Sequence, residues 1–181
     1  ALINEEPAVR TQMRLINAYT GMTRDEIRDN TAKASELWSE INGNITLLDT
    51  VDWTLDDVNS YLDSHEVDIL IIDQLDKVNI SGTFSRTDEK LRAIYTGIRE
   101  LAKRHDICVI ALSQASADGH NKLNLSFDMM ENSKTGKAAE ADLIIGIGRR
   151  DTSDPNEPMR QLNISKNKIN GVHAEITSYI N

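Results

Sequence analysis

Asp73 ends an almost unbroken apolar run, Ile69-Leu70-Ile71-Ile72, and this combination of residue types is suited to nucleotide chemistry. Such a run predicts a strand buried on both faces, as in a parallel sheet covered by helices. An Asp at the carboxyl end of that strand lies where open α/β sheets bind ligands. The pattern matches a Walker B motif, whose carboxylate holds the magnesium ion of a nucleoside triphosphate. A turn-capping role for Asp73 is the alternative.

Two further polar side chains follow predicted strands and would complement Asp73. A triphosphatase needs a phosphate cradle, a magnesium carboxylate, a group that positions the attacking water, and positive charge on the γ-phosphate. Glu5 follows a short apolar strand and is suited to orienting water. Gln114 ends the strand that begins at Ile107, where its amide is suited to sensing the γ-phosphate or orienting water. A solvated turn for Glu5 and an ordinary strand-end hydrogen bond for Gln114 are the alternatives.

A phosphate cradle is missing from the sequence. Ala138, not Ser or Thr, follows the single Gly136-Lys137 pair, and Glu131 occupies the position of the first Gly in G-x-x-x-x-G-K-[ST]. The pair also follows no predicted strand, so we reject it as a P-loop. A P-loop normally joins the first strand of such a fold to its first helix. We therefore expect both to precede Ala1 in a longer parent protein, and we expect this chain alone to be inactive.

Lys166 and Lys168 occupy alternate positions where a predicted strand runs into a turn, so both side chains should point to the same side. Two adjacent like charges are usually a solvated edge. If subunits form a ring, however, the position suits cations that reach a neighbour's nucleotide.

The elements that position these residues follow from hydrophobic spacing. The first strand is followed by a helix after Pro7, and helical spacing predicts further helices at 25–41, 55–65 and 87–104. Apolar runs predict strands at 44–49, 67–72, 107–113, 142–148, 160–166 and 174–180. The last three have little helix between them, which favours an antiparallel extension. The segment 115–135 is long and polar, which marks it as functional or disordered.

Composition narrows the class of protein. A chain of 181 residues with 39% hydrophobic and 27% charged residues suits one domain, residues 1–181. The lone Cys108 excludes an internal disulfide, which fits a reducing cytoplasm, and it is expected to be an inert core residue. No run reaches the roughly 18 apolar residues that span a bilayer.

The net charge is −9, but residues 134–168 are net positive by two. Nucleic acid would therefore have to be bound by local loops or by several copies around a ring.

Taken in order, these segments resemble the RecA-like ATPase core of the hexameric replicative helicases, the DnaB-type and phage primase-helicase family. Ile3-Asn4-Glu5-Glu6-Pro7 resembles the family's strand-end Glu motif, and Ile71-Ile72-Asp73-Gln74-Leu75 its Walker B. Ile110-Ala111-Leu112-Ser113-Gln114 is similar to its sensor strand, and Ala141-Asp142-Leu143-Ile144 to its A-D-L-I strand. Lys166-x-Lys168-x-x-Gly171 is similar to the K-x-R motif that completes the adjoining subunit's active site. Apart from the P-loop, the resemblance covers essentially the whole chain.

Two departures from the family pattern matter. Lys168 stands where the family has its arginine finger, which keeps the charge but loses the planar fork that grips phosphate. The segment 130–136 departs from the family's D-L-R-x-S-G, and Lys134 is its candidate loop cation. The DNA-contacting loop after Gln114 holds few cations, and its candidates are His120, Asn121 and Lys122.

The resemblance implies an α/β, RecA-like three-layer fold, with a mostly parallel sheet flanked by helices and an antiparallel extension at the C-terminal edge. It implies Glu5, Gln114, Lys166 and Lys168 as catalytic residues, with Asp73 binding Mg²⁺ through water beside ATP or another NTP. The function would be that of the motor portion of a bacterial or phage replicative DNA helicase: an ATP-binding hydrolase that forms a homo-hexameric ring and translocates on single-stranded DNA. Primase and other replication proteins would be further partners. The alternatives are another RecA-like ATPase, a recombinase or clock-type enzyme, and a ring or loader subunit that does not hydrolyse NTP.

Overall fold

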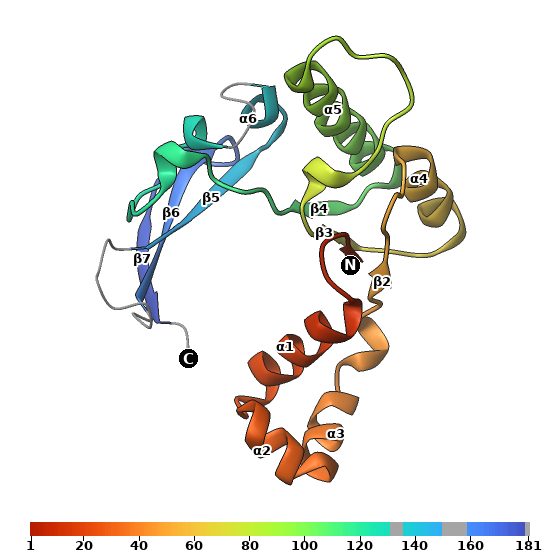
Figure 1. Ribbon diagram of the computed structural model, residues 1–181, viewed down its shortest axis with the longest axis vertical. Helices are drawn as coiled ribbons and strands as arrows, with labels where there is room; N and C mark the ends of the chain where they lie inside the picture. Colours follow the sequence, from red (N-terminus) through yellow and green to blue (C-terminus); the bar gives the residue numbers. More distant parts are fainter. Residues whose placement is uncertain (131–135, 150–158, 180–181) are drawn as a thin grey trace. The chain divides into compact units, whose positions relative to one another are not determined.

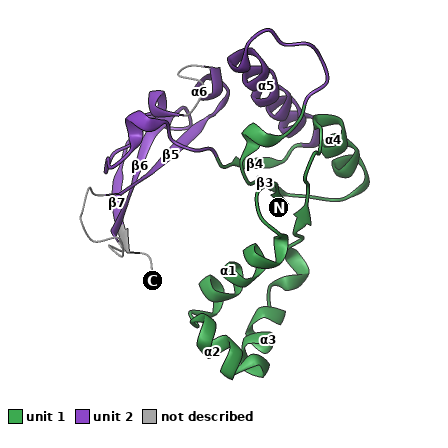
Figure 2. Ribbon diagram, viewed as in Figure 1, with its two compact units in different colours: residues 1–79, 106–112 green, residues 80–105, 113–181 purple. Residues whose placement is uncertain are grey.

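The computed structural model describes residues 1–130, 136–149 and 159–179, of which Ser178 and Tyr179 are described without side chains. The chain forms two compact units (Figure 2). Unit 1 comprises residues 1–79 and 106–112, and unit 2 comprises residues 80–105 and 113–181. The single-domain organisation expected for residues 1–181 stays a prediction.

Unit 1 contains a four-stranded sheet in the order β2-β1-β3-β4. Figure 1 labels β2, β3 and β4. Its strands are β1 (Leu2–Ile3), β2 (Leu48–Asp49), β3 (Ile69–Ile72) and β4 (Cys108–Ala111). All three pairings are parallel, with Leu2 opposite both Leu48 and Ile72. The carboxyl ends of the strands therefore meet at one edge of the sheet, as the sequence predicted.

The expectation that β3 is buried on both faces is wrong. Leu70 and Ile72 of β3 are 3% and 0% exposed, whereas Ile69 and Ile71 are 55% and 38% exposed. Cys108 of β4 is also exposed, so it is not the core residue that the sequence suggested. Successive strand side chains point to opposite faces. An apolar run shows that both faces suit burial, but it does not show that other elements cover both.

Three helices of unit 1 follow β1: α1 (Ala8–Thr20), α2 (Arg24–Asp29) and α3 (Thr31–Ser39). A single helix over 25–41 was expected, but it is broken at Asn30, whose φ of −130° and ψ of 50° are not helical. A capping box between Thr23 and Glu26 starts α2. The apolar stripe still packs as predicted, because Ile27, Ala34 and Trp38 are buried on both sides of the break.

The remaining elements of unit 1 precede and follow β3 along the chain. The strand predicted at 44–49 shortens to β2, preceded by the 3-10 helix η1 (Asn42–Asn44). Helix α4 (Leu55–Ser64) starts at the predicted cap, where Thr54 and Asp57 form a capping box. Its Val58 and Leu62 are buried. The 3-10 helix η2 (Leu75–Lys77) follows Asp73 and buries Leu75.

Unit 2 is built on two helices and a second sheet. Helix α5 (Thr87–His105) matches the predicted helix closely and contacts the short helix α6 (Gly136–Glu140). The apolar face of α5 is buried at Leu91, Ile94, Tyr95, Ile98 and Leu101.

The three predicted C-terminal strands form an antiparallel sheet in unit 2, in the order β5-β6-β7. They are β5 (Leu143–Gly148), β6 (Met159–Asn167) and β7 (Glu175–Tyr179). The described part of the polar segment after Gln114, up to Met130, holds the 3-10 helices η3 (Ala117–Gly119) and η4 (Phe127–Met129). Across the described ranges, no helix has the length and apolar character needed to cross a membrane.

Candidate functional site

Glu5 and Asp73 follow the carboxyl ends of two neighbouring parallel strands, β1 and β3. Asp73 comes directly after β3, and its backbone N–H donates to the carbonyl of Leu2 at 2.9 Å. Glu5 lies two residues beyond β1. The structure thus brings together the two carboxylates that sequence analysis assigned to Mg²⁺ binding and to water activation.

A polar brace, which sequence analysis missed, fixes the backbone at this edge. Asn4 donates from Nδ2 to the carbonyl of Asp73 at 3.0 Å. Thr50, which is 2% exposed, donates from Oγ1 to Oδ1 of Asn4 at 2.5 Å and from its N–H to the carbonyl of Ile3 at 3.0 Å. Buried polar groups of this kind need partners, and here each partner comes from an adjacent strand end. The available signal was a polar residue immediately after each short apolar strand.

The surroundings of Asp73 raise the pKa of its carboxyl group. Partial burial is the largest cause, followed by the negative charges of Glu5 and Glu6, while Lys77 and Arg14 act in the opposite direction. Removing water and adding like charges both disfavour the ionised form. A group of carboxylates in this state favours the binding of a cation.

Glu5 is held by two side chains that sequence analysis did not single out. The Gln74 side-chain amide donates to Glu5 Oε2, and Lys77 Nζ lies 3.3 Å from Glu5 Oε1. Gln74 has a φ of 52°, a left-handed conformation that is uncommon for a residue other than glycine. Such conformations cluster at ligand and active sites. Both residues belong to the turn that directly follows Asp73.

The donor set fits magnesium better than a cation held by protein ligands alone. Carboxylate oxygens are hard ligands, and Mg²⁺ is usually bound through one or two carboxylates together with waters and substrate phosphates. Within the described ranges, no group of three or more His, Cys, Asp or Glu side chains is arranged to hold a metal ion. Asp73 and the neighbouring Glu5 match a magnesium site that is completed by nucleotide and water.

Gln114 follows β4 through Leu112 and Ser113, and its side chain is exposed. Leu112 continues the pairing at the end of β4, because its N–H donates to the carbonyl of Ile72 at 2.9 Å and its carbonyl accepts from Leu75 at 3.1 Å. The chain leaves the carboxyl edge of the sheet at this point, and Ser113 and Gln114 begin the second segment of unit 2. The clustering of Gln114 with Glu5 and Asp73 stays a prediction.

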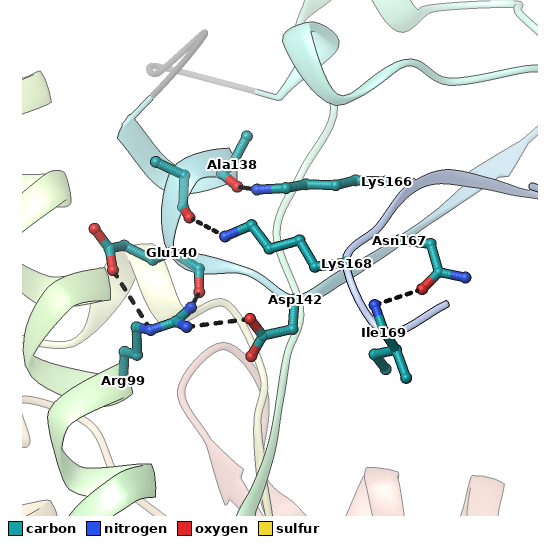
Figure 3. Close-up of polar contacts among 9 residues, drawn as sticks. Arg99, Ala138, Glu140, Asp142, Lys166, Asn167, Lys168 and Ile169 are labelled. Atoms are coloured by element: carbon teal, nitrogen blue, oxygen red, sulfur yellow. Dashed lines mark hydrogen bonds and ion pairs between the residues drawn. The ribbon is translucent and has the colours of Figure 1, made fainter. Parts of the chain in front are cut away.

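Lys166 and Lys168 point to the same side, as their spacing predicted, and both reach the carboxyl end of α6 (Figure 3). Lys166 donates to the carbonyl of Ala138, and Lys168 Nζ lies 2.8 Å from the carbonyl oxygen of Ala139. Arg99 of α5 donates to the next carbonyl, that of Glu140, and its Nη2 lies 3.1 Å from Asp142 Oδ1. The last carbonyls of a helix lack helical partners and attract cations.

Burial and the adjacent charge of Lys168 lower the pKa of Lys166, although Asp142 acts in the opposite direction. Sequence analysis missed Arg99, because its position on the charged side of α5 looks like an ordinary solvated face.

The loop proposed to contact DNA has an exposed tip and fixed ends. His120, Asn121 and Lys122 are exposed, and Lys134 lies outside the described residues. Beyond the tip, Asn163, which is 7% exposed, accepts from the N–H of Leu125 at 2.9 Å and donates to its carbonyl at 3.0 Å. The carbonyl of Lys122 accepts from the N–H of Arg149 at 3.0 Å. The loop is therefore held against β5 and β6 while its polar tip stays accessible.

Comparisons with known proteins agree with this fold. A solved structure described as an ATPase domain superposes with a TM-score of 0.81 at 18% identity, covering 99% of this chain and 73% of that chain. A second structure, of a DnaB-like replicative helicase and its interactions with primase, has a TM-score of 0.79 at 20% identity. That match covers 97% of this chain and 46% of the other. A search of curated protein sequences gives no match.

The family model for the DnaB-like helicase C-terminal domain matches residues 3–179, a range that includes Glu5, Asp73, Gln114 and both lysines. The expected mostly parallel RecA-like sheet and the additional antiparallel sheet are both confirmed. This chain belongs to the DnaB-like helicase C-terminal domain family and is a helicase motor domain.

Proposed function

We propose that this chain is the NTP-hydrolysing part of a ring-shaped replicative helicase that moves along single-stranded DNA. The observation that supports this most strongly is the pair of carboxylates, Glu5 and Asp73, at the carboxyl edge of parallel strands, with the pKa of Asp73 raised by burial and by Glu5. Open α/β sheets bind ligands at that edge, and a cation would relieve the repulsion between the carboxylates.

Each residue has a distinct chemical role in this proposal. Asp73 would hold Mg²⁺, which would supply positive charge against the nucleotide phosphates. Glu5 orients and deprotonates the attacking water. In the structure Lys77 and Gln74 hold the Glu5 side chain, which restricts the directions that its carboxylate can take. Gln114 senses the γ-phosphate.

Lys166 and Lys168 would act in trans, on the nucleotide of the adjoining subunit. This role in trans is supported by the shared direction of the two side chains and by the exposure of Lys168. Within one subunit their ammonium groups cap α6, so binding a neighbour's phosphate would require them to exchange a helix carbonyl for a phosphate oxygen. That exchange is favourable electrostatically, because a full negative charge replaces a partial one.

The partners follow from this class of motor. We propose a homo-hexameric ring, single-stranded DNA contacted by His120, Asn121, Lys122 and Lys134, and primase among the replication partners. We further propose a bacterial or phage origin and action in the cytoplasm. An exposed loop tip on a fixed base suits a strand-contacting role, because the ends hold its position while the polar tip stays available.

Subunit mixing in the P-loop-containing parent protein tests the proposal. Asp73→Asn subunits and Lys166→Ala/Lys168→Ala subunits should each be inactive alone, because each lacks one half of a shared site. Mixed rings contain some interfaces with an intact Asp73 facing intact lysines, so partial ATPase activity should return. Cations at this position can contribute roughly 10³- to 10⁵-fold in rate, although Lys in place of Arg supplies less.

Two controls make the mixing experiment decisive. Exchange of subunits is verified by native mass spectrometry, and a mixture of Asp73→Asn with Asp73→Asn/Lys166→Ala/Lys168→Ala subunits should stay inactive. If verified mixed rings of the complementary pair recover no activity, the lysines do not complete a neighbour's site and the in-trans role is wrong.

A further inference from the structure

Lys137 is a charged residue with no exposed surface, and the proposed chemistry does not use it. It is the second residue of α6 and is 0% exposed, which makes it the largest fully buried side chain among the described residues. A buried charge is costly unless it is partnered. One attested role of such a group is to hold a neighbouring segment in a single conformation.

The partners of Lys137 lie next to the proposed sensor. Lys137 Nζ lies 3.3 Å from the Oγ of Ser113 and 5.6 Å from the centre of the Tyr95 ring. Ser113 directly precedes Gln114, and Tyr95 is buried in α5. The ammonium group therefore ties the residue before the sensor to the helical part of unit 2.

The opposite end of the same short helix is held by the lysines of the proposed in-trans site. Ala138 directly follows Lys137, and its carbonyl accepts from Lys166, while the carbonyl of Ala139 accepts from Lys168. Arg99 holds the carbonyl of Glu140 (Figure 3). Three cations thus grip three consecutive carbonyls, so a displacement of α6 would move Lys137 and the lysine contacts together.

We propose that Lys137 is a positioning residue: through Ser113 it sets the orientation of Gln114, and through α6 it links that sensor to Lys166 and Lys168. This inference rests on the proposed function for its catalytic consequence, whereas its structural part concerns unit 2 alone. When Lys166 and Lys168 leave α6 for a neighbour's phosphate, the helix is released, and the constraint on Ser113 changes with it.

The structural part is tested on this chain by hydrogen exchange. Lys137→Met keeps a similar volume without the charge, and replacing a buried charge by an apolar side chain is often tolerated. Exchange of the Ser116 amide, which donates to the carbonyl of Met129 at 2.7 Å, should become about tenfold faster, because local opening costs less free energy. Ser113→Ala, a smaller change, should have the same effect, and Ser113→Thr, which keeps the hydroxyl, should restore slow exchange. Lys103→Met, at an exposed position of α5, is the matched control.

The catalytic part is tested in the parent protein. Lys137→Met should lower kcat about 10- to 100-fold with little change in KM for the nucleotide, as expected when a reacting group is misplaced but binding is intact. Combined with Gln114→Ala, it should add nothing further, because both changes disable the same sensor.

The outcomes separate the two proposals. Unchanged exchange of the Ser116 amide in both Lys137→Met and Ser113→Ala, or losses in kcat that multiply with Gln114→Ala, would overturn the positioning role. An active parent in which Gln114→Ala and Asp73→Asn cost nothing would instead overturn the proposed function, and the hydrogen exchange result would then decide the role of Lys137 alone.

Discussion

At the scale of single residues, the decisive feature is the unfavourable environment of the Asp73 carboxylate. Burial and the charges of Glu5 and Glu6 raise its pKa, although Lys77 and Arg14 partly offset them. A protein retains such a group at a cost in stability where it needs a cation site, because a bound cation supplies the missing positive charge.

We predict that Asp73→Asn stabilises the chain at neutral pH in the absence of divalent cations. The folded-state pKa lies above the unfolded value, so ionisation of Asp73 destabilises the fold as pH rises through that range. Below the unfolded value the group is neutral in both states, and the advantage of Asn should vanish. Differential scanning calorimetry between pH 3 and 8 measures this. Asp68→Asn, at the exposed position directly before the same strand, is the matched control substitution.

Glu5→Gln in the parent protein should spare nucleotide binding and greatly reduce hydrolysis. The amide keeps the size of the side chain and one of its two accepting oxygens but cannot accept a proton from water, and loss of a general base typically costs 10²- to 10⁴-fold in rate. Binding of a fluorescent nucleotide and single-turnover hydrolysis measure the two effects separately. Equal losses in both would assign Glu5 to nucleotide binding instead of water activation.

At the scale of elements, two glycines of β5 allow the candidate DNA loop to lie directly on the strand. A Cβ built on Gly148 would fall 1.8 Å from the carbonyl oxygen of Leu123, and one on Gly146 would fall 2.8 Å from the carbonyl oxygen of Leu125. Backbone atoms cannot move away as the end of a flexible side chain can. The Gly-Ile-Gly spacing of β5 therefore sets how closely the loop approaches.

Gly148→Ala should destabilise unit 2 by about 1–3 kcal/mol, the usual cost of overpacking, because the loop must shift to admit the methyl group. Chemical denaturation measures the loss, and in the parent protein the affinity for single-stranded DNA should also fall, since Lys122 is part of the displaced loop. Gly43→Ala, where an added Cβ meets nothing within 4 Å, is the matched control. Wild-type stability of Gly148→Ala would mean that the loop packs differently.

At the scale of the whole molecule, the proposed magnesium carboxylate and the proposed water-positioning group belong to a 181-residue sequence that has no P-loop motif. Backbone amides and a P-loop Lys normally bind the phosphates, and the sequence contains no matching motif. Lys137 of the rejected Gly-Lys pair is fully buried, which is incompatible with a phosphate contact in this conformation.

The isolated chain should therefore neither bind nor hydrolyse ATP appreciably. Isothermal titration calorimetry with Mg²⁺·ATP, and phosphate release over hours, check this expectation, with the parent protein as the positive control. Turnover by the isolated chain that Asp73→Asn leaves unchanged would come from another site or from a contaminant. Turnover that Asp73→Asn abolishes would show that this chain holds phosphate without a P-loop.

Local rules were sufficient for the elements whose formation depends on neighbours in sequence. The amphipathic spacing of α5 and the Thr54–Asp57 capping box predicted both helices within one or two residues of their observed bounds, because helix caps and faces are local features. Asp73 and Glu5 could be assigned to one sheet edge because parallel strands bring their carboxyl ends together.

The remaining features depend on which segments meet, and this only the tertiary structure decided. The exposure of Ile69, Ile71 and Cys108 depends on what covers each face of the sheet, which residue type does not encode. Lys137 in a Gly-Lys pair resembles a surface cation until α5 and Ser113 are seen to enclose it. The Asn4–Thr50 brace joins residues 46 positions apart. The sequence alone determined which residue types are available for nucleotide chemistry. Long-range packing decided which polar groups hold those residues in place.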